Sequence, residues 1–482
     1  MDSERNFFSS EEAPADLGGS SLNSASQGGV SPQASLTNET PKGLGGFLGL
    51  FVKSNFFRPI TIAVLLGSFL IGLGIYVFSN LGNVGGGGEI VWWGVQHDES
   101  VYAPLIAQFE KENPNIRVRY EKQSTSDYRE RLANALAGGS GPDIYEIHNS
   151  WPYMFSRFLD KMPGSIWNAD DYKKSFYPVV TSNFTFGGGI VAVPLEYDAL
   201  TLFINEEIFA ASAKEPPVSW DELRDLAENL TQKDNRGIII QSGVALGNTK
   251  NIDYWPDIVS LMMLQNHVNP VKPTGSFAQD VMSFYIMFDK KTWDESLPSS
   301  TEAFAKGKLA MYFAPSREAT NIVKINPNLR FRTVPIPQLA KNSPQDPDVT
   351  YASYWAMAVS GRSKKSDASW RFLEFMATDE SLKKINENIG KSETFGRVFP
   401  RPSLNTTIRE DSLLGSLVTL APSAGTSLLA DKTNDGETGL NSKVHKAYKV
   451  VIDRGKGVGS GNIEDLAKNL RLILSEFGIP VN

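Results

Sequence analysis

An uncharged apolar run near the N-terminus constrains this chain more than any other feature of its sequence. Residues Ile60 to Phe78 read ITIAVLLGSFLIGLGIYVF and carry no charged side chain. As a helix the run would be about 28 Å long, which matches the hydrocarbon thickness of a bilayer. A cleaved signal peptide would begin near the N-terminus, and a buried core helix rarely stays uncharged for so long. We therefore predict a retained transmembrane anchor over residues 58–79.

The charges on either side of this run predict its orientation. Lys42, Lys53 and Arg58 precede it, and the next basic residue after it is Lys111. Because basic residues stay on the cytoplasmic side, we expect a single-pass protein of the cytoplasmic membrane with its N-terminus in the cytoplasm. Residues 1–57 are rich in Ser, Gly and Asn, which predicts a disordered cytoplasmic tail. A Gly-rich linker, 80–88, would join the anchor to a body, 89–482, on the outer face of the membrane.

Charge and composition exclude several classes of protein. The chain has 47 Lys and Arg residues against 54 Asp and Glu residues, whereas nucleic-acid binders usually carry a basic domain. It has no cysteine and only four histidines, which lie far apart in the sequence, so no disulfide or transition-metal site is expected. A loop from Asp431 begins like a calcium site, but Ser442 stands where a bidentate glutamate is needed. We predict no metal and no cofactor.

The order of short strands and helices in the body indicates an α/β fold. Strands are predicted at 89–93, 116–120 and 141–147, and helices at 102–109 and 127–137, from their apolar periodicity. This order is typical of a βαβαβ unit with a parallel sheet, in which ligands lie beyond the carboxyl ends of the strands. Further strands are predicted at 190–194, 200–204, 237–242, 309–313, 329–335 and 355–359, and further helices at 219–230 and 463–477.

One pair of carboxylates follows a predicted strand and allows two interpretations. Glu196 and Asp198 are two residues apart, so in extended chain they would lie about 6.6 Å apart on one side. That separation suits an inverting glycosidase. The alternative, which we favour, is that the two carboxylates face solvent or accept hydrogen bonds from a ligand without doing chemistry.

Aromatic residues near predicted strand ends and turns are a second candidate signal. A flat apolar ring can pack against a sugar while nearby carboxylates and amides bind its hydroxyl groups. About half of these rings are expected in the core. Neighbouring side chains on a strand point to opposite faces, so Trp92 and Trp93 cannot both face one site, and we favour Trp93. The set comprises Trp92, Trp93, Trp151, Tyr153, Tyr197, Trp255, Tyr354 and Trp355.

Several stretches, taken in order, resemble a known family. The sequence is similar to the family 1 extracellular solute-binding proteins, the maltose-binding-protein-like receptors of ABC importers, over nearly all of 89–482. The matching stretches are EIVWW, LIAQFEKENPNIRVRY, LANALAGGSGPDIYEI, VAVPLEYDALTLFINEEIF, PPVSWDEL, FAKGKLAMYFAPS and ASWRFLEFMATDES. Each motif is weak alone, but their order and spacing are specific.

The resemblance implies a two-lobed, type II periplasmic-binding-protein-like fold with one N-terminal transmembrane helix. Lobe 1 would comprise approximately 89–195 and 356–400, and lobe 2 approximately 199–350 and 401–482, with the ligand in the cleft and closure by hinge motion. The chain would cross between lobes near 195–199, 351–355 and Pro400. Asp198 matches an acidic position that contacts sugar hydroxyls in the family, and 148–151 match a loop that supplies ligand contacts.

The sequence departs from the family at two places around the implied cleft. Where many sugar-binding relatives have Trp after the FAKGKLAM strand, this chain has Ser316 and Arg317, and Arg317 could pair with an anionic ligand. Where relatives often have glycines before the returning strand, it has Tyr351, Ser353 and Tyr354. The predicted ligand-binding residues are Trp93, His97, Asn149, Trp151, Asp198, Trp255, Arg317, Tyr354 and Trp355.

The combined interpretation is a receptor without catalysis. It would be a membrane-anchored, monomeric substrate-binding protein that captures a sugar, an oligosaccharide or a similar polar solute and delivers it to the subunits of an ABC permease. Two alternatives stay open. One is an envelope glycan hydrolase that uses Glu196 and Asp198, and the other is a ligand-sensing scaffold protein whose cytoplasmic tail reports occupancy.

Overall fold

The computed structural model describes residues 67–68, 87–341, 343, 345–427, 435–455 and 462–480. The predicted tail, and all but two residues of the predicted anchor, lie outside the described residues. Among the described residues, no helix is both long enough and apolar enough to span a membrane. The folded body described below belongs to the unit Phe78–Asn482.

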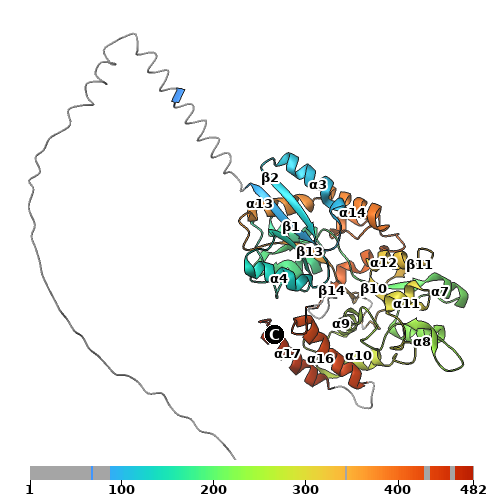
Figure 1. The fold of residues 1–482 in the computed structure, drawn as a ribbon. Coiled ribbons are helices and arrows are strands. Elements are labelled where there is room, and N and C mark those ends of the chain that lie inside the picture. Colours follow the sequence, from blue (N-terminus) through green and yellow to red (C-terminus); the bar gives the residue numbers. More distant parts are fainter. Residues whose placement is uncertain are drawn as a thin grey trace, which may run out of the picture. The chain divides into compact units, whose positions relative to one another are not determined.

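The first sheet has the strand order β2-β1-β3-β13-β6. Strands β1 (Gly88–Gly94), β2 (Ile116–Lys122) and β3 (Ile144–His148) are parallel, and they alternate with α3 (Glu99–Glu112) and α4 (Tyr128–Gly138). The predicted βαβαβ unit is thus confirmed. Strand β13 (Trp355–Val359) runs antiparallel between β3 and β6 (Ala192–Val193). Two later helices, α13 (Ser366–Met376) and α14 (Asp379–Glu393), lie beside this sheet (Figure 1).

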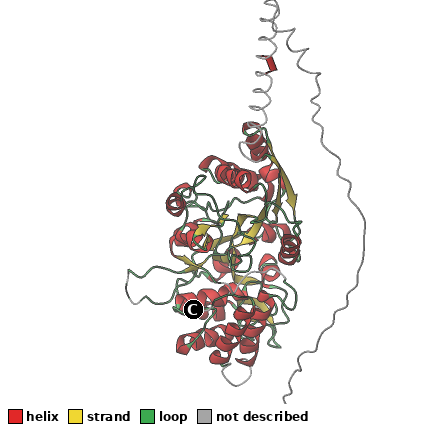
Figure 2. Cartoon of the chain, turned by 90° about the vertical axis from the view of Figure 1, so that its left-hand side faces the viewer, coloured by secondary structure: helices red, strands yellow, loops and turns green. Residues whose placement is uncertain are grey.

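The second sheet has the order β11-β7-β10-β9-β8. Strand β7 pairs antiparallel with β10 and with β11, and β9 pairs parallel with β10. Helices pack around both sheets (Figure 2). The strands are β7 (Leu200–Asn205), β8 (Gln232–Lys233), β9 (Ile239–Val244), β10 (Leu309–Pro315) and β11 (Phe331–Val334).

The remaining elements are mostly helices. Those that follow β7 are α7 (Glu206–Ser212), α8 (Trp220–Leu230), α9 (Trp255–Gln265), α10 (Gly275–Ile286), α11 (Ser300–Ala305), α12 (Glu318–Ile325), α15 (Gly415–Leu420), α16 (Leu440–Gly455) and α17 (Ile463–Glu476). Shorter elements are α5 (Ala169–Ser175), α6 (Pro178–Phe184), η1 (Pro402–Leu404), η2 (Ala421–Ser423), β4 (Thr185–Phe186), β5 (Gly189–Ile190), β12 (Thr350–Tyr351) and β14 (Ala424–Gly425).

Local sequence signals account for the helix ends and faces. The Ser219 hydroxyl accepts a hydrogen bond from the Glu222 amide at 3.2 Å and so caps α8. The Glu222 carboxylate in turn accepts from the Val218 amide at 2.8 Å, which satisfies another free donor at the helix start. The helix predicted at 463–477 is also present as α17, which buries one apolar stripe of Ile463, Leu466, Ala467, Leu470 and Leu474.

Three segments lie side by side where the chain passes between the two sheets. The Tyr197 amide donates to the Val398 carbonyl at 2.8 Å, and Ala199 forms an isolated bridge with Ala352. These contacts bring together the three predicted crossing regions. Strands of the first sheet come from 88–193 and 355–359, and strands of the second come from 200–334. The exact lobe limits remain a prediction.

Candidate functional site

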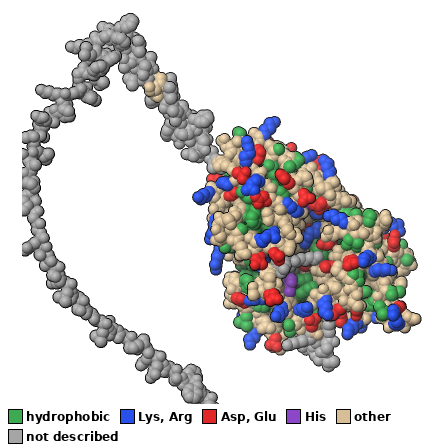
Figure 3. Space-filling model, viewed as in Figure 1, with side chains coloured by type: hydrophobic (Ala, Val, Ile, Leu, Met, Phe, Trp, Pro, Cys, Tyr) green, Lys and Arg blue, Asp and Glu red, His purple; other side chains and the backbone are tan. Residues whose placement is uncertain are grey.

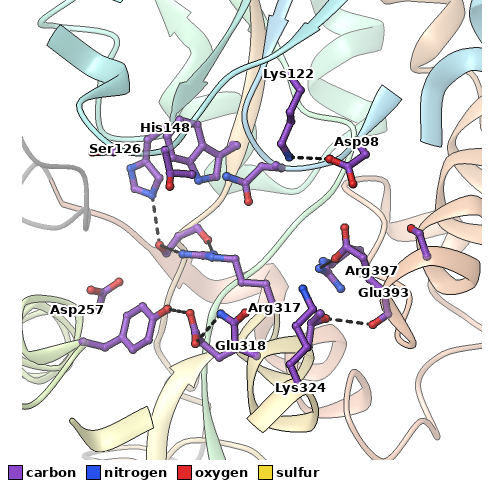
Figure 4. A pocket seen from close by; sticks show the side chains of 18 residues that line it. Asp98, Lys122, Ser126, His148, Asp257, Arg317, Glu318, Lys324, Glu393 and Arg397 are labelled. Atoms are coloured by element: carbon purple, nitrogen blue, oxygen red, sulfur yellow. Dashed lines mark hydrogen bonds and ion pairs between the residues drawn. The ribbon is translucent and has the colours of Figure 1, made fainter. Parts of the chain in front are cut away.

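A cavity of about 720 Å³ is lined by residues from both sheets. The first sheet supplies residues that follow the carboxyl ends of β1, β2 and β3, as expected for a parallel sheet. The second supplies the start of α9 and the residues after β10. Figure 4 shows these side chains converging from opposite sides. The lining comprises Gln96, Asp98, Lys122, Thr125, Ser126, His148, Tyr254, Asp257, Arg317, Glu318, Thr320, Asn321, Lys324, Ser353, Trp355, Ser392, Glu393 and Arg397.

Asp198 holds Arg317 at the floor of this first cavity. One carboxylate oxygen accepts a hydrogen bond from the Ser316 amide at 2.9 Å, and the other accepts from the Arg317 amide at 3.1 Å and from the Arg317 guanidinium at 3.2 Å. The same guanidinium donates to the Ser353 carbonyl at 2.8 Å. Asp198 is 3 % exposed, so it acts through Arg317 rather than facing the cavity itself.

On the side of the second sheet, the cavity wall is built from the start of α9 and the start of α12. The Tyr254 hydroxyl donates to the Glu318 carboxylate, and the Asn321 amide donates to the same carboxylate at 3.2 Å. Asp257 lies one helical turn after Tyr254 and is buried. This wall therefore presents carboxylate and hydroxyl groups, which are the groups that bind ligand hydroxyls or cations.

A buried ionic network closes one end of the first cavity. The His97 ring contacts Glu393 through Nδ1 at 2.5 Å and Glu196 through Nε2 at 2.9 Å. Arg397 binds Glu393 at 2.5 Å and Glu196 at 3.8 Å. Burial disfavours the charged form of His97, but the two carboxylates outweigh burial and raise its pKa to about 9. The network thus ties the loop after β1 to the crossing segment and to the end of α14.

Glu196, one carboxylate of this network, is unsuited to acid catalysis. Burial alone would raise the pKa of Glu196, but His97 and the nearby arginines outweigh it and lower the pKa to about 2. A glycosidase acid needs a carboxyl group that stays protonated near neutral pH. Asp198 accepts hydrogen bonds from the protein's own backbone and from Arg317. Of the two interpretations of this pair, the geometry favours hydrogen bonding without chemistry, although the partners are protein groups rather than a ligand.

Glu146 is a further buried carboxylate behind the loop that follows β1. It accepts hydrogen bonds from the Val95 amide and, at 3.0 Å, from the Gln96 amide. Burial raises its pKa to about 7, although these amides and His97 oppose the shift. Glu146 therefore shapes the loop that carries Gln96 into the cavity.

The structure brings two of the nine predicted binding residues, Arg317 and Trp355, to the first cavity. Trp355 is 8 % exposed and packs at 74° against Trp151, which is fully buried. Asn149 instead lines a second cavity. Trp93 donates to Glu121 at 2.6 Å, and Trp255 packs edge-on against His445. His97, Trp151, Asp198 and Tyr354 are buried behind the site. Ligand contact by any of these residues remains a prediction.

Several residues of the first cavity were not singled out from the sequence. Tyr254 and Asp257 flank Trp255, and their i, i+3 spacing places them on one helix face. Glu393 is the last residue of α14 and Arg397 lies in the loop that follows, so helical spacing does not predict their ion pair. In the described part of the chain, no group of three or more His, Cys, Asp or Glu residues is placed so that it could hold a metal ion.

Comparison with known proteins identifies the family to which this chain belongs. The family model described as bacterial extracellular solute-binding protein matches residues 94–383. The diacetylchitobiose-binding protein DasA of Streptomyces coelicolor is 24 % identical over 317 residues, which cover 60 % of this chain and 70 % of DasA.

Two solved structures have the same fold. The sugar-binding protein MalE of Xanthomonas citri aligns with a TM-score of 0.63 and 18 % identity, over 81 % of this chain and 98 % of MalE. The GacH receptor of Streptomyces glaucescens, solved without ligand and with acarbose, aligns with a TM-score of 0.58 and 20 % identity, over 81 % and 99 %.

Proposed function

Because this chain belongs to the bacterial extracellular solute-binding protein family, we propose that it captures a carbohydrate between its two sheets and delivers it to an ABC permease. The observation that carries the proposal is the first cavity, whose walls come from both sheets. The segments that join the sheets lie together on one side. Such an arrangement can close over a ligand by a hinge motion, and a permease can recognise the closed form.

The chemistry of the first cavity supports a polar, hydroxyl-bearing ligand. Its lining offers carboxylates, guanidinium and ammonium groups, amides and hydroxyls, together with Tyr254 and the edge of Trp355. Carbohydrates are bound by such groups, which accept and donate hydrogen bonds to hydroxyls around an apolar ring face. The names of DasA, MalE and GacH associate these proteins with diacetylchitobiose, sugar and acarbose respectively, which supports the same ligand class for this chain.

The family consists of binding proteins, and we propose that this chain likewise performs no catalysis. The low pKa of Glu196 and the backbone contacts of Asp198 support this view. A hydrolase would instead turn over a chromogenic glycoside. The absence of turnover under conditions in which the same glycoside binds is the expected result.

We also propose that residues 58–79 anchor the body to the outer face of the cytoplasmic membrane, with residues 1–57 in the cytoplasm. The uncharged run Ile60–Phe78 and the basic residues that precede it support this topology. Deleting 60–78 should release the protein from the membrane fraction, whereas deleting 2–40 should leave it bound. Release of both variants, or of neither, would refute the anchor.

Ligand binding can be tested on the purified full-length chain in mild detergent. We expect a set of uncharged mono- and oligosaccharides to include one that raises the melting temperature, because a ligand at a hundredfold its Kd adds about 2.7 kcal/mol of stability. Asp257→Asn removes a buried carboxylate from the first cavity and should weaken binding about tenfold, or about 1.4 kcal/mol. The matched control is Asp225→Asn on α8, whose carboxylate is 67 % exposed. Equal affinity in both variants would refute the assignment of this cavity.

A further inference from the structure

A second cavity, of about 610 Å³, lies at the other end of α9 from the first. One side comes from the chain that follows β3 and from α6. The other side comes from the chain that follows α9 and from the residues after β14. Its lining comprises Asn149, Ser150, Pro152, Tyr153, Ser182, Asn183, Leu264, His267, Val268, Asn269, Pro270, Val271, Thr426 and Ser427.

The two cavities differ sharply in charge. The first is lined by four acidic residues and four Lys or Arg residues. Among the described residues that line the second, none is Asp, Glu, Lys or Arg, and His267 is the only imidazole. Charged side chains of both signs are scattered over the visible face of the molecule (Figure 3), so the described lining of the second cavity is less charged than that face. No described residue of this lining carries a formal charge that could compensate an ionic ligand, so we expect the second cavity to take uncharged ligands.

Polar groups in the second cavity remain available for a ligand. Asn183 accepts hydrogen bonds at Oδ1 from Asn149 at 3.2 Å and from the Tyr354 hydroxyl at 2.8 Å. These two bonds fix the orientation of its amide and leave Nδ2 as a donor with no partner among the described residues. Asn269 is similar, because its Oδ1 accepts from the Val271 amide at 3.0 Å. Amides oriented in this way can bind hydroxyl oxygens without first rearranging.

The rest of the lining is apolar or aromatic. Leu264, Val268 and Pro270 form an apolar surface. Tyr153 is 42 % exposed, and its ring is held edge-on by Phe186 at a centroid distance of 5.0 Å. An exposed aromatic ring beside oriented amides is suited to a ligand that has an apolar ring face and hydroxyl groups at its rim.

We propose that the second cavity is a separate binding site for an uncharged, hydroxyl-bearing ring compound such as a neutral sugar unit. This goes beyond the proposed function, which concerns the charged first cavity. The two sides of the second cavity are already joined, since the Asn149 amide donates to the Thr426 hydroxyl at 2.7 Å. An occupant would therefore contact both sides of the crossing region. If a ligand in the second cavity changes the affinity of the first cavity by some factor, thermodynamic linkage requires that a ligand in the first cavity change the affinity of the second by the same factor.

The absence of cysteine from the sequence allows a direct test. Ser182 is exposed at the rim of the second cavity, so Ser182→Cys places a unique thiol there. We expect maltose or N,N′-diacetylchitobiose at millimolar concentration to slow maleimide labelling of this variant of the full-length chain at least tenfold. Glucosamine and gluconate, which carry charge, should not slow it. Ser296→Cys, an exposed position outside both cavities, is the matched control and should be labelled at an unchanged rate.

The result must be separated from binding at the first cavity. The labelling is therefore repeated with Asp257→Asn present, and the concentration that gives half protection should change by less than twofold. Absence of protection by every uncharged sugar would overturn the second site. So would protection that disappears with Asp257→Asn, because closure over the first cavity would then explain it. Failure of the proposed function has a different signature, namely an unprotected thiol in Lys324→Cys at the rim of the first cavity.

Discussion

Replacing His97 by glutamine should remove a defined part of the pH dependence of stability. The folded chain raises the pKa of His97 to about 9, whereas an unfolded histidine has a pKa of about 6.5. The difference of about 2.5 pH units corresponds to about 3 kcal/mol. A raised pKa stabilises the folded state fully below pH 6.5, and this stabilisation is lost as the pH rises from 6.5 to 9. Glutamine does not titrate, so the variant should lack this loss.

The assay is urea unfolding of the full-length chain, followed by tryptophan fluorescence at intervals between pH 6.5 and pH 9. The free energy of unfolding of the natural chain should fall by about 3 kcal/mol more than that of His97→Gln over this interval. Burial raises the pKa of Glu146 to about 7 and His97 opposes that shift, so both profiles are measured with Glu146→Gln present, which leaves the histidine as the difference between them. Parallel profiles would show that the buried network does not hold His97 in its charged form.

Three further variants test other contacts. Arg129→Met leaves the buried Asp435 carboxylate without its ion-pair partner and should lower the free energy of unfolding by about 3–5 kcal/mol. In the same urea titration, the double variant with Asp435→Asn should recover part of this loss. A double variant that recovers none of it would argue against the ion pair. Ser219→Ala removes the cap of α8 and should cost about 1 kcal/mol, whereas a loss that is also seen in Ser296→Ala would not be due to the cap. Asp198→Asn should weaken sugar binding about tenfold, or about 1.4 kcal/mol, with little change in circular dichroism; unchanged affinity by calorimetry would remove Asp198 from the site.

The fold was largely predictable because its signals are local. Apolar periodicity and Gly or Pro stops are set by neighbouring residues, so the βαβαβ unit and the cap at Ser219 could be predicted from the sequence. The antiparallel insertion of β13 between β3 and β6 was not predicted from periodicity, because strand pairing across 162 positions leaves no pattern in either segment. Only the family resemblance placed 355–359 beside the first lobe.

The site was predicted less well, because side-chain direction depends on neighbours from distant segments. Strand alternation correctly placed Trp92 and Trp93 on opposite faces: Trp92 is in the core, but the indole of Trp93 turns to Glu121 on the neighbouring strand. Similarly, Trp255 was preferred for its ring, although Tyr254, just before it, and Asp257, two residues after it, line the cavity. Their i, i+3 spacing was visible in the sequence, but the direction of that face depends on how α9 packs.

The placement of β13 also affects how the chain can be made. The first sheet needs a strand that begins 162 positions after β6 ends, since 355 − 193 = 162. A ribosome that adds about 5–20 residues per second needs roughly 8–30 s for that stretch. During this interval β3 and β6 have no partner between them, and their open edges can pair with other chains. A nascent chain that stops before Trp355 therefore exposes two strand edges that β13 covers in the complete body, and these edges favour aggregation.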